Sequence, residues 1–222
     1  MSAEPASESA PVEPVRDGVF FTLPEALPRG RHGLAREQIT DAQRERMLAA
    51  VTELLAARGY RGFGVADIAN RAGVSLGAFY RCFEGKDACV FAGYDRFIEV
   101  LLRRMVAVDT PDDDRPALAG ALIAAYLETL QADPVVARAY QVEIDALGPP
   151  ARARRRAALT LFATHIRERV AAGEELPWTA YLGVVYAARQ LASDALDTAT
   201  EPDLPALGRD LQVWMADLFR VR

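Results

Sequence analysis

The residue types that most often carry out enzyme chemistry are scarce in this sequence. The serines are Ser2, Ser7, Ser9, Ser75 and Ser193, and the histidines are His32 and His165. None of them lies in a G-x-S-x-G or H-E-x-x-H pattern, and no glycine-rich phosphate loop or Glu-x-x-His pair occurs. Cys82 and Cys89 lack the C-x-x-C spacing of a zinc site. We therefore expect no enzyme, no metal site and no cofactor.

The distribution of charge indicates a different chemistry, the binding of a polyanion. The whole chain carries a net charge of −5. Residues 29–86 nevertheless hold ten basic and six acidic residues, a net charge of +4, and the remaining 16 basic and 25 acidic residues give −9. A basic segment on an acidic chain is typical of a nucleic-acid-binding face. Chance clustering of solvated charges is the alternative, and the arginine run at 152–156 is itself interpreted as a solvated or ion-pairing face.

Two short helices joined by a tight turn can present such a face. Apolar residues at helical spacing predict the first helix, Gly73 suits the left-handed residue that closes it, and Ser75 is a good N-cap for the second. If Phe79 and Phe83 point inward, the remaining faces of the second helix can meet DNA. The bare helix-turn-helix pattern also occurs in helix corners that bind no DNA.

The rest of the chain predicts an all-α fold. A capping box at Thr40–Gln43 is expected to start a first helix that ends at Gly59, and a further, linking helix begins near Lys86. Proline and glycine divide the remainder into helices over 115–132, 135–147, 151–171, 178–196 and 204–219. We expect a disordered tail over 1–28, a basic arm and three-helix helix-turn-helix domain over 29–86, and a larger helical domain over 87–222.

Residues 39 to about 98 resemble the N-terminal domain of the tetracycline-repressor (TetR) family. The resemblance rests on Gly59-Tyr60, on the segment VADIANRAGVS at 65–75 and on FYRCFEGKD at 79–87, in that order and spacing. It implies an all-α homodimer that binds a double-stranded DNA operator through the N-terminal domain. It also implies that the domain over 87–222 binds a small-molecule effector and dimerises, and that the effector usually relieves repression.

The resemblance also assigns roles to individual residues. It implies that Ser75, Tyr80 and Lys86 contact phosphates, with Ser75 also capping the recognition helix. The residues that would face the bases are Leu76, Gly77, Ala78 and Arg81. Leu76 can touch a thymine methyl group and Arg81 can bind guanine edges, whereas the two small residues permit close approach. Ordinary helix packing or solvation is the alternative for each of these side chains.

The larger domain offers candidates for an effector pocket and for a dimer interface. The pocket candidates are Tyr126, Tyr140, Gln141, Phe162, His165 and Tyr181, a mainly apolar set with a few polar groups. Each of them could instead be a core residue with a satisfied polar tip. The candidates for an apolar four-helix seam between two protomers are Val184, Val185, Ala188, Leu191, Ala192, Ala195, Leu211, Trp214, Met215 and Leu218. A monomer that buries these residues internally is the alternative.

Two further expectations concern location and function class. No apolar run is long enough to span a membrane, and residues 1–15 lack the basic and apolar regions of a secretory signal, so we expect a cytoplasmic protein without membrane contact. The competing function is a helical protein-interaction module of the same fold that has lost specific DNA binding.

One departure from the family pattern concerns the start of the first helix of the motif. The family usually has a threonine pair there, whose hydroxyl reaches a phosphate, and this chain has Phe63 and Gly64. Glycine is an acceptable cap but supplies no hydroxyl. The basic arm with Arg29 and Arg31 could compensate by entering the minor groove. A solvated arm without a DNA contact is the alternative.

Replacing Arg29 and Arg31 together with alanine tests the arm. Because each neutralised phosphate releases counterions, the slope of log affinity against log salt should flatten by up to about two units. The measurement is a salt series of fluorescence anisotropy titrations on duplex DNA. An unchanged slope would remove the arm from the interface.

Overall fold

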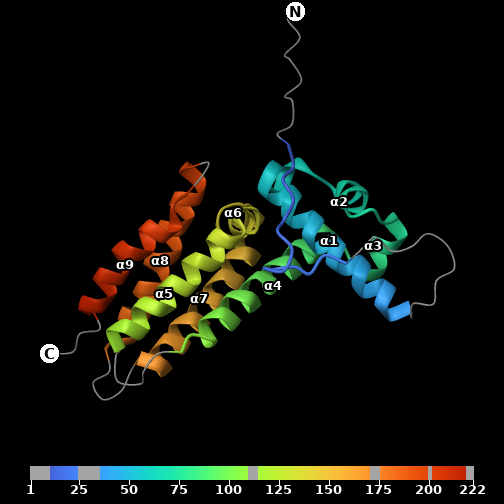
Figure 1. Cartoon of the computed structure of the whole chain (residues 1–222). Helices are drawn as coiled ribbons and strands as arrows, with labels where there is room; N and C mark the ends of the chain where they lie inside the picture. Colours follow the sequence, from blue (N-terminus) through green and yellow to red (C-terminus); the bar gives the residue numbers. More distant parts are fainter. Residues whose placement is uncertain (1–10, 25–35, 110–114, 171–175, 200–201, 219–222) are drawn as a thin grey trace, which may run out of the picture.

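The fold is built from helices. The computed structural model describes residues 11–24, 36–109, 115–170, 176–199 and 202–218. The helices are α1 (Arg36–Arg58), η1 (Tyr60–Gly62), α2 (Val65–Ala72), α3 (Leu76–Cys82), α4 (Lys86–Val106), α5 (Arg115–Ala132), α6 (Pro134–Gln141), η2 (Glu143–Leu147), α7 (Pro149–Val170), α8 (Trp178–Thr198) and α9 (Leu204–Leu218). Within these ranges the only β pairing is an isolated bridge, and no helix could cross a membrane. The all-α prediction is confirmed (Figure 1).

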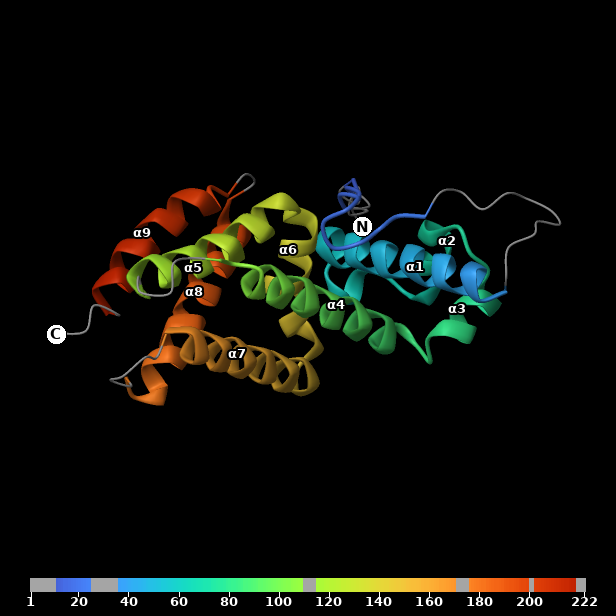
Figure 2. The ribbon, with the colours of Figure 1, turned by 60° about the horizontal axis from the view of Figure 1, so that its bottom comes forward.

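Helix α4 joins two groups of helices. It packs against α1, in the group formed by α1, α2 and α3, and against α5, α6 and α7. Figure 2 shows α4 extending from the end near α3 into the group formed by α5 to α9. In that second group α5 packs on α9 and α7 packs on α8. The predicted arrangement of a three-helix unit, a linking helix and a larger helical unit is confirmed.

The predicted start of the first helix is wrong. Helix α1 already includes Arg36, and the Thr40 hydroxyl donates a hydrogen bond of 2.9 Å to the Arg36 carbonyl one turn earlier. Thr40 is therefore an interior residue and not a cap. The predicted end is confirmed, because Gly59 follows the helix with a φ of 64°, a value that glycine adopts without strain. The helix predicted over 135–147 is divided into α6 and η2.

The predicted disordered tail is wrong for residues 11–24. Val15, Phe20 and Phe21 are at most 4% exposed, and they belong to the same apolar core as α1 and α4. The composition of the tail is polar on average, but its apolar residues are concentrated in this short stretch. Burying two phenylalanines contributes several kcal/mol, which offsets the entropy cost of ordering the segment.

A buried contact fixes where α1, α4 and α6 meet. The Tyr140 hydroxyl of α6 lies 2.8 Å from the Thr52 hydroxyl of α1, and Thr52 also donates to the Leu48 carbonyl at 2.7 Å. Tyr140 reaches this place because α4 has a glycine beside it. A Cβ atom on Gly93 would lie 1.9 Å from the Tyr140 oxygen and 3.0 Å from its Cζ atom. Only glycine fits at position 93 while Tyr140 holds this position.

Gly93→Ala is expected to lower the free energy of unfolding by about 1–3 kcal/mol, because the core must be overpacked. Tyr140→Phe removes the oxygen that the new methyl group would strike. The alanine at position 93 should therefore cost at least about 1 kcal/mol less in the Tyr140→Phe background. Chemical denaturation of the four proteins measures this coupling. Equal costs in the two backgrounds would show that Gly93 is not needed for the contact.

Candidate functional site

The turn between α2 and α3 has the geometry of a helix-turn-helix. Gly73 has a φ of 65° and a ψ of 36°, the left-handed conformation, and the Val74 amide donates to the Ala69 carbonyl at 2.9 Å. The Ser75 hydroxyl then accepts a hydrogen bond of 3.1 Å from the Ala78 amide and caps α3. Phe79 is fully buried and packs near Phe83, with 5.7 Å between ring centroids. The predicted positions of the turn, the cap and the inward face are confirmed.

One face of α3 is open to solvent. Leu76 is 50% exposed and Tyr80 is 59% exposed, and Ser75, Gly77 and Arg81 are exposed as well. It is unusual for so short a helix to expose two large apolar or aromatic side chains. Their arrangement around a serine cap, a glycine and an arginine suits a surface that meets phosphates and base edges.

Ala78 does not belong to this face. It is 1% exposed and lies beside Phe79 in the interior of the three-helix unit. The prediction that Ala78 faces a base is therefore wrong. Its neighbour Gly77 stays on the exposed side, where an added Cβ would meet the Arg81 guanidinium at 3.8 Å and the Ser75 oxygen at 3.9 Å.

Lys86 has a role within the domain that the sequence did not reveal. Its ammonium group donates to the Tyr60 carbonyl at 2.8 Å and to the Phe63 carbonyl at 3.0 Å, and it lies 3.9 Å from the centroid of the Tyr60 ring. The Tyr60 hydroxyl donates to Asp87, and burial together with this bond raises the pKa of Tyr60 to about 12. Lys86 thus ties η1 to the start of α4. One of its three N–H groups is left over for a phosphate.

The start of α2 is capped although Phe63 and Gly64 replace the family's threonine pair. The Gly64 amide donates to the Asp67 carboxylate at 2.8 Å, which is one half of a capping box. This bond orders the helix end without a hydroxyl that could reach DNA. Arg29 and Arg31, which could compensate, lie outside the described residues.

A cavity lies inside the larger helical group. Its atom-free space, including the part open to solvent, is about 630 Å³. The lining is mostly apolar: Tyr94, Phe97, Ile98, Leu101, Met105, Leu122, Ile123, Tyr126, Tyr140, Gln141, Arg155, Ala158, Leu159, Phe162, Ile166, Val184, Val185, Ala188, Arg189 and Met215. Four pocket candidates from the sequence, Tyr126, Tyr140, Gln141 and Phe162, are among these residues.

The polar groups of the cavity include two arginines. Arg155 of α7 and Arg189 of α8 both contact the carboxylate of Asp145, and Arg189 also donates to the Gln141 carbonyl. The Arg189 side chain is only 11% exposed. The Tyr126 hydroxyl and the Gln141 side-chain oxygen are buried and make no hydrogen bond within the described part of the chain. Buried polar atoms without partners are costly, so this part of the cavity is suited to a polar group of a ligand.

Two of the predicted pocket residues do not line the cavity. Tyr181 is 1% exposed and packs in the core, and His165 lies on α7 outside the lining. Burial, followed by the charge of Arg169, lowers the pKa of His165, so its imidazole is neutral near pH 7 and holds no anion by charge. Among the described residues no cluster of His, Cys, Asp or Glu could hold a metal ion.

Neither cavity arginine is among the pocket residues that the sequence predicts. Arg155 belongs to the arginine run at 152–156, and it forms an ion pair with Asp145, as does Arg154 with Asp95 at 3.0 Å. Arg189 carried a signal that could have been used. It follows Val184, Val185 and Ala188 on the buried side of α8, and a single arginine on an otherwise apolar helix face indicates a specific partner.

The chain is similar to known bacterial regulatory proteins. Residues 47–92 match the model of the bacterial regulatory proteins of the tetR family. The helix-turn-helix transcriptional activator FasR of Mycolicibacterium smegmatis is 30% identical over 110 residues, which are 49% of this chain and 50% of that protein, so the match spans about half the length of this curated relative.

Solved structures share the fold over most of the chain. The fatty acid degradation regulator FadR of Bacillus halodurans has a TM-score of 0.66 at 20% identity, covering 81% of this chain and 97% of its own. FadR of Bacillus subtilis in complex with stearoyl-CoA has a TM-score of 0.63 at 18% identity, covering 77% of this chain and 96% of its own. The resemblance to the TetR family is thus confirmed over residues 47–92, which match the family model, and the solved structures show the shared fold.

Tyr80→Phe tests the exposed face of α3. Because the hydroxyl lies on an exposed side chain, its loss should leave the free energy of unfolding unchanged. Loss of a phosphate hydrogen bond should weaken duplex binding about fivefold, near 1 kcal/mol, without changing the salt slope, since no charge is removed. The control is Leu161→Ala, a change on an exposed residue of α7 that lies outside the proposed DNA-binding and dimer faces. Equal affinities of the two variants for duplex DNA would remove Tyr80 from the interface.

Proposed function

We propose that this protein is a homodimeric, cytoplasmic transcriptional regulator, and not an enzyme, which binds a DNA operator and is released from it by a small-molecule effector. The observation that carries the proposal is the combination of an exposed recognition face on α3 with an internal apolar cavity in the second helical group. A DNA-reading surface and a ligand cavity in one chain are the two sites that an effector-controlled regulator needs.

The DNA-binding site proposed here comprises the exposed residues of α3 and its flanks. Its members are Ser75, Leu76, Gly77, Tyr80 and Arg81, with the remaining N–H group of Lys86 and with Arg29 and Arg31 of the basic arm. Phosphate contacts from Ser75, Tyr80 and Lys86 would fix the register of α3 in the major groove, and Leu76 and Arg81 would read bases.

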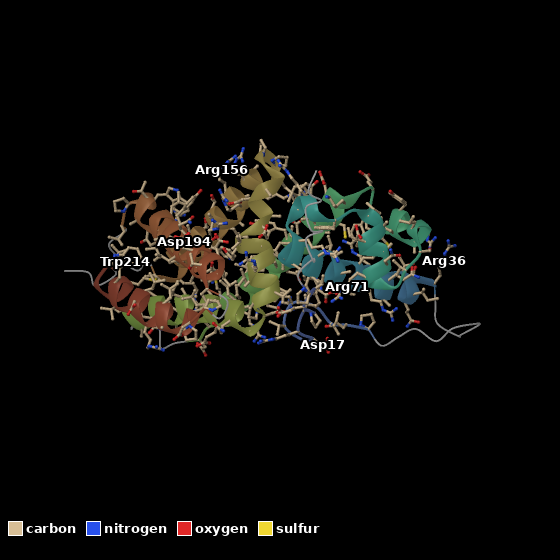
Figure 3. All side chains as sticks on the ribbon, turned by 90° about the horizontal axis from the view of Figure 1, so that it is seen from above. Asp17, Arg36, Arg71, Arg156, Asp194 and Trp214 are labelled. Carbon is tan, nitrogen blue, oxygen red and sulfur yellow. The ribbon has the colours of Figure 1, made fainter. Side chains whose placement is uncertain are left out.

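The dimer interface proposed here is smaller than the sequence suggested. Six of the seam candidates are buried within the protomer and at most 8% exposed: Val184, Val185, Ala188, Ala192, Leu211 and Met215. Of the other four candidates, Ala195 and Leu218 are half-buried, and Leu191 and Trp214 are 42% and 43% exposed. Two further exposed side chains of these helices are Tyr186 at 40% and Val213 at 69%. Figure 3 places Trp214 of α9 and Asp194 of α8 away from Arg36 at the far end of α1. Pairing through α8 and α9 would leave both copies of α3 free for DNA.

The effector class proposed here is a molecule with a long apolar chain and a polar or anionic head. The apolar walls of the cavity suit the chain, and Arg155, Arg189 and Gln141 suit the head. The stearoyl-CoA complex of Bacillus subtilis FadR supports an acyl-CoA as the first candidate. FasR, the relative of 30% identity, is an activator, so activation in place of repression is the second candidate for the outcome at the promoter.

Stearoyl-CoA is the probe that tests this function, with coenzyme A as the matched control that lacks the chain. Stearoyl-CoA should raise the melting temperature and weaken binding to a duplex from upstream of the protein's own gene about tenfold or more. Coenzyme A alone should do neither.

The variant Ala188→Phe should lose the response to stearoyl-CoA, because the new ring fills the cavity, while its ligand-free affinity for the duplex is unchanged. The measurement is anisotropy of labelled duplex with and without the probe. An unchanged response in this variant would show that the cavity is not the effector site.

A further inference from the structure

Residues 11–24, which we call the strap, cross the junction between the two helical groups. Figures 1 and 2 both show this dark blue segment against α1. The strap has no helix, and its turn is closed by the Gly18 amide on the Phe21 carbonyl at 2.9 Å and by the Leu23 amide on Asp17 at 2.7 Å. Contacts with other elements therefore hold it in place. Such a segment can detach without unfolding a helix.

One end of the strap is bound to the helix-turn-helix. Glu53 of α1 is only 7% exposed, and its two carboxylate oxygens are used by different elements. One accepts the Val15 amide of the strap at 3.0 Å, and the other accepts the side chain of Arg71 of α2 at 2.6 Å. Arg71 also donates to the Val12 carbonyl at 3.2 Å. The strap, α1 and α2 thus share one charged network.

The strap is also bound to the effector domain. The Arg16 amide donates to Asp133 at 2.7 Å, and the Arg16 guanidinium donates to the Ala132 carbonyl at 2.9 Å. Asp133 is fully buried, and its second oxygen caps α6 by accepting the Val136 amide at 3.2 Å. Helix α6 carries Tyr140, which lines the cavity. If the strap detached, one oxygen of this buried carboxylate would lose its donor, which is costly.

A single aromatic ring separates the strap from the cavity. Phe20, at 2% exposure, stacks on Phe97 of α4 with 5.5 Å between centroids and 29° between ring planes. Phe97 lines the cavity and also packs on Tyr140 at 5.5 Å. A ligand that moves Phe97 must therefore disturb the packing of Phe20, because a packed aromatic cluster does not deform continuously.

We propose that the strap is a coupling element, which holds α2 in place while the cavity is empty and loosens when a ligand displaces Phe97. Loosening removes the Val15 and Val12 contacts from Glu53 and Arg71, so α2, and α3 with it, changes its position relative to α4. The inference rests on the proposed function for the identity of the ligand. The attachment of the strap through Phe20 and Phe97 is independent of that identity.

The first arm of the test uses hydrogen exchange of the full chain without ligand. Phe97→Ala should accelerate exchange of the Val15 and Arg16 amides about tenfold or more, because it removes the ring on which Phe20 stacks. The matched control is Ile98→Ala, which also truncates a cavity-lining side chain of α4. If both amides keep their protection in Phe97→Ala, or if Ile98→Ala accelerates them equally, the proposal is overturned.

The second arm measures duplex affinity with and without stearoyl-CoA in wild type, Phe20→Ala and the control Leu23→Ala, an exposed residue of the same strap. Phe20→Ala should bind stearoyl-CoA, by thermal shift, yet lose most of the change in duplex affinity that wild type and Leu23→Ala show. If stearoyl-CoA changes the duplex affinity of Phe20→Ala as much as that of wild type, the coupling role of the strap is overturned, and the proposed function is unaffected. If stearoyl-CoA fails to bind wild type, the proposed ligand class is wrong, and the first arm decides on the strap.

Discussion

The hydrogen bond between Tyr140 and Thr52 fixes the junction on which the other features depend. It joins α6 to α1, and it is possible only because Gly93 leaves α4 without a side chain at that point. The Tyr140 ring then forms part of the cavity wall and packs on Phe97, and Phe97 in turn stacks on Phe20 of the strap. The helix-turn-helix domain and the cavity are therefore connected through a few buried side chains in direct contact. Close packing of this kind has discrete arrangements, as the proposed effector response requires.

The two proposed sites differ in environment: one is an exposed helix face, and the other is a buried cavity with polar groups. The exposed face of α3 is positioned by local contacts, because Ser75 caps the helix and Phe79 packs near Phe83 on its inner side. The cavity carries buried polar atoms without partners and an arginine pair that shares one carboxylate. A ligand that supplies those partners gains free energy that the empty protein lacks. Coupling between the sites is a difference between these two states and requires no contact between ligand and DNA.

The sequence predicted what local residue chemistry determines. The limits of α2 and the start of α3 followed from Gly73 and Ser75, since caps and turns act within a few residues. Features that depend on distant partners were missed. Lys86 looked like a phosphate ligand, but two carbonyls more than twenty residues earlier take up most of its donors. Average composition hid the apolar run Val19-Phe20-Phe21 in the tail, and the burial of Ala78 depends on how α3 packs. The cavity arginines could be located only once α7 and α8 were in place.

The most direct test of the account is binding of the wild-type protein to duplex DNA from upstream of its own gene, by fluorescence anisotropy across a salt series with scrambled duplex as competitor. The account predicts specific binding by at least two protomers per site that weakens steeply with salt and resists the scrambled competitor. Weak binding that is equal for scrambled DNA, together with no enriched site in a genome-wide pull-down, would contradict it. The interaction-module interpretation of the same fold would then be the better one.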